Sequence, residues 1–143
     1  DFLLDSFTTA VGDGEMAVEV RFPTPPPRTA GSYQKIERKV GDFATASAAA
    51  RVTLDENGSI SGAGVAIGAV GATALRVKDA ELLLTGAKPT KELIRAAGDA
   101  ARKLADPAAD NRGSVEFKKE MAGVLVGRAL VVALERLGVE GLR

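Results

Sequence analysis

Alternating apolar and polar side chains predict a β-strand over residues 43–54. The even-numbered positions from Ala44 to Leu54 are all apolar, whereas the odd-numbered positions are mostly polar or small. A period of two is typical of a strand that lays one face on a hydrophobic core. The predicted core face consists of Ala44, Ala46, Ala48, Ala50, Val52 and Leu54.

The sequence Asp55-Glu56-Asn57-Gly58 predicts a turn directly after this strand, and therefore a β-hairpin. A two-residue turn at Asn57-Gly58 places apolar residues opposite one another on a shared face. A four-residue loop over 55–58 keeps that facing, whereas a three-residue loop would turn one strand over and bury Ser61. The sequence therefore predicts which residues share a face of the hairpin, but it does not determine the length of the loop. The expected pairs are Val52 with Ala63, Ala50 with Val65, and Ala48 with Ile67.

A second alternating stretch predicts an earlier strand over residues 16–22. Met16, Val18, Val20 and Phe22 are apolar, and the positions between them are small or charged. The proline-rich sequence at 23–27 follows, and its lack of amide donors predicts a stiff, extended connector. Residues 1–15 carry no clear periodicity.

Three helices are predicted in the second half of the chain, where apolar residues recur at spacings of three and four. The first covers residues 77–85 and stops at Gly86. The second begins after Thr90 as N-cap and runs to about Ala105, and the third is capped by Ser114. The third helix is apolar nearly all round between 121 and 134, so we expect it to be covered on more than one side. This apolar run is too short to cross a bilayer.

The order of these elements predicts an α+β fold. We expect an antiparallel sheet of three to four strands, packed on one face by about three helices. An alternating βαβ order is missing, which excludes the doubly wound dinucleotide-binding fold. Accordingly, Gly62-x-Gly64-x-x-x-Gly68 is not interpreted as a phosphate-binding motif, because its third glycine comes one residue late.

The same glycines remove side-chain bulk from the second face of the hairpin. Gly62, Gly64 and Gly68 are expected opposite Thr53, Arg51 and Ser47. One interpretation is that another part of the protein lies close against this face. The other is that the glycines mark a twisted or bulged strand facing solvent.

Composition narrows the chemistry available to this chain. Its 143 residues, 45% of them hydrophobic, fit one globular domain. Nineteen basic and nineteen acidic residues give a net charge of zero, which argues against nucleic acid or an anionic membrane surface as partner. The sequence contains no Cys and no His, so thiolate or imidazole metal sites, disulfides and Ser-His-Asp triads are excluded.

Charged clusters in the sequence are interpreted as solvated turns and connectors. Asp55 with Glu56, and Asp13 with Glu15, lie in predicted turns, where carboxylates keep ordinary pKa values and make poor general acids. Lys35, Arg38 and Lys39 form a basic cluster that we interpret, from composition alone, as part of a connector. The residues by themselves therefore indicate no catalytic site and no metal site.

Four ordered blocks of sequence resemble the C-terminal domain of the FAD-binding medium subunit of molybdenum hydroxylases, the family of aerobic carbon monoxide dehydrogenase and xanthine dehydrogenase. The opening of the chain, up to Pro23, also resembles the stretch that leaves the FAD domain of that subunit. The resemblance therefore covers nearly the whole chain. The blocks are Ser32–Ala44, Leu54–Gly58, Val70–Arg76 and Asn111–Lys118.

This resemblance implies a domain that follows the FAD-binding domain of an oxidoreductase subunit, helps to cover the flavin and helps to assemble the subunits. In such complexes electrons pass from a molybdopterin site through two iron-sulfur clusters to FAD and then to an acceptor. The iron-sulfur clusters and the molybdopterin belong to partner subunits, and most of the FAD site belongs to upstream domains. The resemblance thus implies residues 1–22 as the segment leaving the FAD domain and residues 23–143 as the α+β domain.

The resemblance also implies a set of residues near the flavin ring. Tyr33, Gln34 and Lys35 match the segment that approaches the ring, where a cation or an amide donor stabilises negative charge on the reduced flavin. Asp42 lies at the same edge, with the capping of a turn as its favoured role. Arg112 and Ser114 match a block whose work is loop anchoring and helix capping. No catalytic residue is expected in this chain, so it is expected to be inactive alone.

A second hypothesis from the sequence is a stand-alone interaction domain that self-associates through the helix at 114–138 and dimerises when isolated. Because the chain opens with Asp1 and has no basic, apolar signal sequence, we expect part of a longer cytoplasmic protein. The substrate and the electron acceptor are not encoded in this domain.

Overall fold

The computed structural model describes residues 2–142. Strands precede helices along the chain, as expected for an α+β fold. The strands are β1 (Leu3–Asp5), β2 (Thr8–Thr9), β3 (Thr29–Ile36), β4 (Ala46–Leu54), β5 (Ile60–Gly68) and β6 (Leu75–Arg76). The helices are α1 (Lys78–Leu84), α2 (Lys91–Leu104) and α3 (Val115–Glu135).

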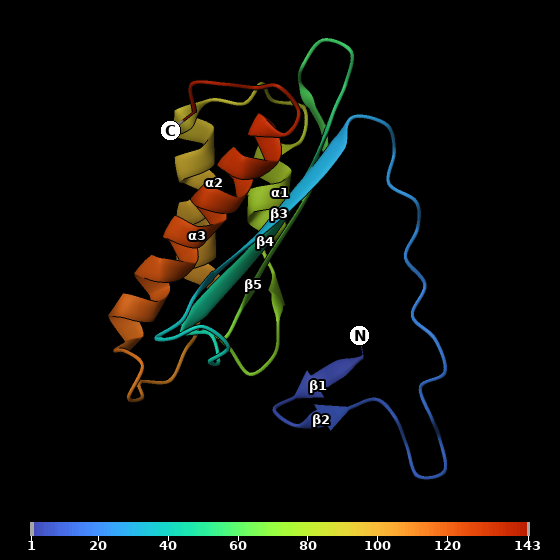
Figure 1. The fold of residues 1–143 in the computed structure, drawn as a ribbon, viewed down its shortest axis with the longest axis vertical. Helices are drawn as coiled ribbons and strands as arrows, with labels where there is room; N and C mark the ends of the chain where they lie inside the picture. The colour runs from blue at the N-terminus through green and yellow to red at the C-terminus, as the bar shows by residue number, and fades with distance from the viewer. Residues whose placement is uncertain (1, 143) are drawn as a thin grey trace.

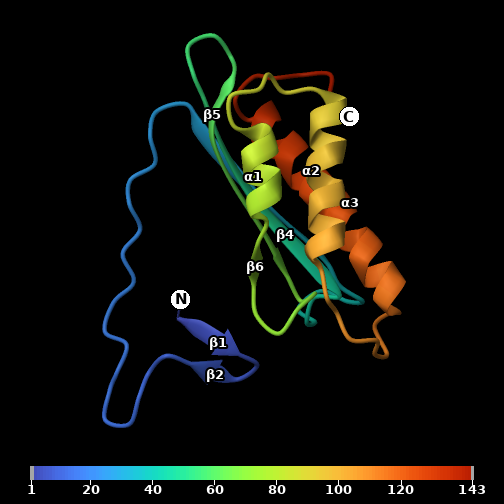
Figure 2. The same ribbon diagram turned by 180° about the vertical axis from the view of Figure 1, so that it is seen from behind.

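An antiparallel sheet in the order β3-β4-β5-β6 forms one layer, and the three helices form the other. Figures 1 and 2 show all three helices on the same face of this sheet. The α+β architecture predicted from the order of elements is confirmed, with four strands in the main sheet. The opposite face of the sheet carries no layer of secondary structure from the described residues.

The β4–β5 hairpin has the predicted register. Val52 pairs with Ala63, and Ala50 and Ala48 follow in step with Val65 and Ile67. The loop that joins the two strands, however, has neither the two-residue nor the four-residue length that would keep the predicted residues facing the core without a bulge. The amide of Asp55 donates to the carbonyl of Ser59 at 2.9 Å, which leaves a three-residue loop with Gly58 at φ +78°. An irregularity next to Thr53 and Leu54 shifts the register by one residue, so Ile60 is buried and Ser61 stays exposed.

Strand β3 occupies a segment to which the sequence analysis assigned no strand, and Lys35 near its end was interpreted as part of a connector. Its eight residues pair with β4 along their whole length, from Thr29 opposite Thr53 to Ile36 opposite Ala46. The strand lies at the edge of the sheet, and its composition is mixed, with Gly31, Ser32 and Gln34 among its residues. Its pairing partner β4 stabilises it, which a hydrophobicity pattern along a single segment does not reveal.

The predicted helix caps are confirmed. The Thr90 hydroxyl accepts a hydrogen bond from the Leu93 amide at 3.1 Å, and the Ser114 hydroxyl accepts one from the Phe117 amide at 3.2 Å. Each satisfies one backbone donor that the first helical turn leaves without a partner. The first helix begins at Lys78 and ends at Leu84, slightly shorter than predicted.

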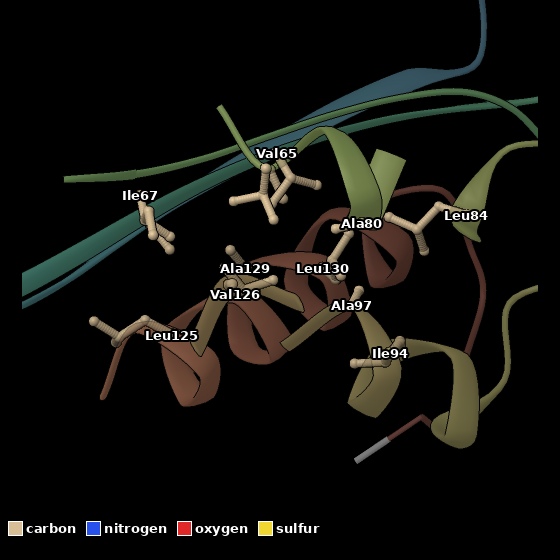
Figure 3. Packing of buried hydrophobic residues seen from close by; sticks show 14 of the residues in the cluster. Val65, Ile67, Ala80, Leu84, Ile94, Ala97, Leu125, Val126, Ala129 and Leu130 are labelled. Carbon is tan, nitrogen blue, oxygen red and sulfur yellow. The ribbon is translucent and has the colours of Figure 1, made fainter. Parts of the chain in front are cut away.

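The apolar helix α3 is covered on two sides by elements of the same chain. It packs across β3 and β4 on one side and along α2 on the other. Figure 3 shows Leu125, Val126, Ala129 and Leu130 of this helix among side chains from the sheet and from the other helices. The expectation of multiple cover is confirmed, and the cover comes from within the domain. The remaining side of α3 is exposed and mixed in character, with Phe117 and Val124 43% and 40% exposed beside Glu120 and Arg128. Self-association through this helix stays a prediction.

The predicted strand over residues 16–22 is wrong for this structure. These residues are extended but belong to no strand, and their side chains are exposed. Figure 1 shows them in a long arm that leaves the sheet and ends in the small β1–β2 hairpin. Alternation predicts a strand only where a neighbouring backbone accepts its hydrogen bonds, and no strand of the described residues pairs with this segment.

Candidate functional site

The open face of the sheet is the main candidate surface. Tyr33 and Lys35 of β3 point to this side, since they pair with Ala49 and Ser47 on the face opposite the core. Small residues occupy much of the rest of the face, including the predicted glycines of β5. The glycines lie opposite β4 as expected: Gly62 opposite Thr53, Gly64 opposite Arg51 and Gly68 opposite Ser47.

The glycines make room for side chains of β4. A Cβ on Gly68 would come within 2.8 Å of the Ser47 hydroxyl oxygen, and a Cβ on Gly64 would lie 3.9 Å from Arg51 Nε. The neighbouring side chains therefore lie low against the sheet instead of standing above it. The result is a face of low relief on which the exposed ring of Tyr33 is the only aromatic group of β3 to β6.

A shallow depression of about 430 Å³ lies on this face next to strand β6. Arg51, Gly64, Ala66 and Arg76 contribute to its lining, together with Glu81 of helix α1. The sequence analysis did not select Arg76 or Glu81 as functional residues. Their only signal is an acidic residue five positions after an arginine, which is too common to identify a site.

Glu81 is held in place by hydrogen bonds to the sheet edge and to Arg76. Its carboxylate accepts from the Val65 amide at 3.0 Å and from Arg76 Nε at 2.9 Å. The Arg76 hydrogen bond is the main cause that lowers the pKa of Glu81, and the Val65 amide adds to it against the opposing effect of burial. Because the carboxylate satisfies a buried strand amide, its first role is structural.

Lys35 is oriented by contacts at the end of β3. Its ammonium group forms an ion pair with Glu37 and donates to the backbone carbonyl of Asp42 at 3.2 Å. The hydrogen bond to Glu37 is the largest cause that raises the pKa of Lys35. The amine therefore stays charged at neutral pH, at the edge of the open face.

Gln34 lies on the other side of the sheet from Tyr33 and Lys35. It pairs with Ala48, a core residue, and its amide donates to the Ser32 hydroxyl at 3.0 Å. It lines a small hollow beside Arg128 and Val131 of α3. The strand alternation thus separates Gln34 from the other residues that the resemblance implies for the flavin site.

Asp42 acts as an anchor between two loops. Its carboxylate accepts from the Phe43 amide at 2.8 Å, from Arg38 at 3.1 Å and from Arg112 at 3.3 Å. The backbone bond from Phe43 is the main cause that lowers the pKa of Asp42, followed by the hydrogen bond from Arg38. The Arg112 guanidinium also lies 5.8 Å from the centre of the Phe43 ring. The β3–β4 connection and the loop before α3 are thereby joined.

Metal chemistry has no support among the described residues. No cluster of three or more Asp and Glu side chains in residues 2–142 lies close enough to hold an ion. No described helix is long and apolar enough to pass through a membrane. The candidate site is therefore a surface, built from Tyr33, Lys35 and the small residues of β4 and β5.

A family model described as CO dehydrogenase flavoprotein C-terminal domain matches residues 31–133. The carbon monoxide dehydrogenase medium chain of Hydrogenophaga pseudoflava is 39% identical over 136 residues, which cover 94% of this chain and 47% of that relative. The 6-hydroxypseudooxynicotine dehydrogenase complex subunit alpha of Paenarthrobacter nicotinovorans is 33% identical over 136 residues, covering 95% of this chain and 46% of that relative.

Solved structures agree with the sequence relatives. The carbon monoxide dehydrogenase of Hydrogenophaga pseudoflava, in a form that lacks the Mo-pyranopterin moiety of the molybdenum cofactor, superposes with a TM-score of 0.90 at 40% identity. The match covers 94% of this chain and 47% of the matched chain. The present chain thus spans about half the length of the relatives that it matches.

Proposed function

The chain belongs to the family of CO dehydrogenase flavoprotein C-terminal domains, and from this premise we propose that it is the C-terminal domain of the FAD-containing subunit of a molybdenum-dependent oxidoreductase. Its work in that subunit is to cover the flavin and to help assemble the subunits. The partners in this proposal are the upstream FAD-binding domain and the subunits that carry iron-sulfur clusters and molybdopterin, in a cytoplasmic complex.

The open face of the sheet carries this proposal. The core of the domain lies entirely between the sheet and the helices, so the domain is complete without anything on the other face. That other face nevertheless presents a low surface of small residues, with Tyr33 of the edge strand β3 61% exposed. A low surface of small residues with one exposed aromatic ring suits contact with a flat partner.

Two of the four residues implied for the flavin site fit a flavin on this face. The Tyr33 ring provides an aromatic surface, and the Lys35 ammonium provides a fixed positive charge at the end of the same strand. A bound flavin supplies the electron-carrying chemistry of the subunit. Lys35 is oriented by Glu37 and by the Asp42 carbonyl, and its ammonium group would donate a hydrogen bond to negative charge on the reduced flavin, with Glu37 offsetting part of its positive charge.

The other two residues support the site from a distance in this proposal. Gln34 faces helix α3, so it contributes to the packing of β3. The Asp42 carboxylate is occupied by Phe43, Arg38 and Arg112, and an ionised carboxylate donates no hydrogen bond to a reduced flavin. We therefore assign Asp42 to holding the end of β3, and with it Lys35, in position.

Spectroscopy of the full-length subunit and of the 143-residue chain tests whether upstream sequence provides most of the FAD site. The purified full-length subunit should carry bound flavin, seen as its visible absorbance band at neutral pH. The 143-residue chain mixed with FAD should show no saturable titration and no oxidoreductase activity, because most of the cofactor site belongs to upstream sequence. Tight FAD binding by the 143-residue chain alone, or a full-length subunit that takes up no FAD, would contradict the proposal.

A further inference from the structure

Arg51 of β4 lies exposed on the open face and has no hydrogen bond or ion pair with another residue of the described chain. Its guanidinium lies along the sheet beside Gly64, where an added Cβ would be 3.9 Å from Nε and 4.0 Å from Nη2. The side chain therefore lies low over β5, at the shallow depression next to β6. Its planar set of N–H donors is available to a group that enters this depression.

The depression carries one positive charge in excess. Arg76 also lines it, but Arg76 Nε and Nη2 bind the Glu81 carboxylate at 2.9 and 2.7 Å. Arg76 is the main cause that lowers the pKa of Glu81, and the charge of Arg51 is a smaller one, so two guanidiniums lie near one carboxylate. The Val65 amide occupies the same carboxylate. The charged residues of the lining are these two arginines and Glu81, which leaves Arg51 uncompensated.

The strand register places the depression at the far side of the sheet from the Tyr33 ring. Tyr33 lies opposite Ala49, Ala49 opposite Ala66, and Ala66 opposite Arg76. The backbones of Tyr33 and Arg76 are thus three strand spacings of about 4.8 Å apart, or roughly 14 Å. The two alanines between them add little height. A partner surface that contacts Tyr33 therefore also reaches the depression without obstruction from the sheet.

The arm before β3 lies on the same side of the sheet as the depression. Figures 1 and 2 show the arm and the β1–β2 hairpin on the side away from the three helices. In the proposed function the flavin-binding portion precedes this arm and covers the open face. A guanidinium without a partner is costly to remove from water, so a surface that covers Arg51 needs to bring a negative group.

We propose that the depression between Arg51 and Arg76 receives an aspartate or glutamate side chain from the flavin-binding portion of the same subunit, with Arg51 as its main partner. This inference rests on the proposed function, which supplies that portion. One carboxylate matches the single uncompensated charge, whereas the pyrophosphate of FAD carries more than one negative charge. The planar guanidinium donates to both oxygens of a carboxylate at once, which fixes orientation as well as distance. The ion pair thereby aligns the open face with the flavin-binding portion.

Carbodiimide cross-linking of the full-length subunit tests the proposal. Arg51→Lys places an amine at the depression, and the reagent joins an amine to a carboxylate in contact with it as an amide, taking up the water released. Mass spectrometry should find the peptide that contains position 51 linked to an acidic residue that precedes this chain. Arg95→Lys is the matched control, because Arg95 is an exposed arginine of α2 on the helix side. It should give no link to the flavin-binding portion. A link from position 51 to Glu81 alone, or no link, overturns the proposal.

Chemical modification of the wild-type arginines provides a second measurement that needs no variant. Phenylglyoxal should modify Arg51 at least about tenfold more slowly in the full-length subunit than in the 143-residue chain, because it reaches a paired guanidinium only when the contact opens. Arg95 should react at the same rate in both proteins. The slow reaction of Arg51 should persist after FAD is removed. If it is lost with FAD, a phosphate of the cofactor is the anion and the proposal is overturned.

The outcomes separate this inference from the proposed function. A full-length subunit that carries flavin but shows fast modification of Arg51 overturns the carboxylate site and leaves the function standing. A cross-link from position 51 to the preceding portion, in a subunit that takes up no FAD, supports the site and overturns the function. If Arg51 becomes slow to react in the 143-residue chain as its concentration rises, a second copy covers the face and the proposal is overturned. The wild-type modification decides even if Arg51→Lys prevents folding.

Discussion

Gly98 of α2 and Gly123 of α3 lie in direct backbone contact where the two helices cross. A Cβ built on Gly98 would come within 2.8 Å of the Gly123 carbonyl oxygen, and one on Gly123 would come within 2.9 Å of the Gly98 carbonyl oxygen. The two helices approach this closely because neither residue has a side chain. Helix α3 also packs against β3 and β4, and so supports the strand that carries Tyr33 and Lys35.

Gly98→Ala should destabilise the domain. The added methyl group meets backbone atoms, which cannot rotate away, so the helices must separate at a cost of about 1–3 kcal/mol. Chemical denaturation of the purified chain would measure the loss as a lower midpoint. Gly127→Ala is the matched control, because its Cβ would meet only Ile94 Cγ2 at 3.7 Å. Since alanine favours a helix interior, the control should be neutral or more stable by about 0.5–1 kcal/mol. Equal losses in both variants would contradict the close crossing.

Glu81→Gln should lower the stability of the domain at neutral pH by about 1–3 kcal/mol. The amide retains the shape of the side chain but loses the charge that Arg76 and the Val65 amide contact. Because the pKa of Glu81 in the folded chain is below its ordinary value of 4.5, ionisation stabilises the fold above about pH 4.5. This contribution is lost as the pH falls through the lowered pKa.

The difference between wild type and Glu81→Gln should therefore shrink below about pH 4.5, as measured by denaturant midpoints across a pH series. Glu56→Gln, in the exposed hairpin turn, is the control and should stay within about 0.5 kcal/mol of wild type. A pH-independent difference for Glu81→Gln would show that its charge is not what stabilises the sheet edge.

Lys35→Met and Asp42→Asn should have different effects on a full-length flavin-containing subunit. Lys35→Met removes the fixed positive charge from the open face, so the flavin should become harder to reduce and its midpoint potential should fall. Asp42→Asn should mainly loosen the two loops that it joins, seen as faster amide exchange at residues 37–45 and 110–113.

Gln34→Leu provides the control for this pair, since Gln34 is on the neighbouring position of the same strand but on the helix side. It should leave the flavin spectrum and potential unchanged. A change in potential with Gln34→Leu but not with Lys35→Met would mean that the flavin is not on the open face.

Thr90→Ala should cost about 1 kcal/mol of stability through the loss of the N-cap of α2. Thr90→Ser keeps the hydroxyl that accepts from the Leu93 amide, and it should restore most of that loss. Thermal unfolding of the two variants beside wild type measures the difference. If Thr90→Ser were as unstable as Thr90→Ala, the methyl group and not the capping bond would be responsible.

Local sequence determined the elements whose stabilising interactions lie close together along the chain. The helix caps at Thr90 and Ser114 depend on amides three residues away, and the β4–β5 facing follows from one alternating pattern joined to another by a short turn. The resemblance of the four sequence blocks identified the family, which the match over residues 31–133 confirms. The flavin-site residues stay a prediction, and strand alternation determines which of them share a face.

Tertiary structure decided the features that depend on a distant partner. Residues 16–22 and β3 show the contrast: the first has a clear strand pattern without a neighbouring strand, and the second has a mixed pattern but pairs with β4 along its own whole length. The three-residue hairpin loop likewise needed a compensating bulge near Ser61, which no count of turn residues predicts. In each case a backbone or packing contact across the sheet supplies the stabilising free energy. The sequence of one segment does not reveal that contact.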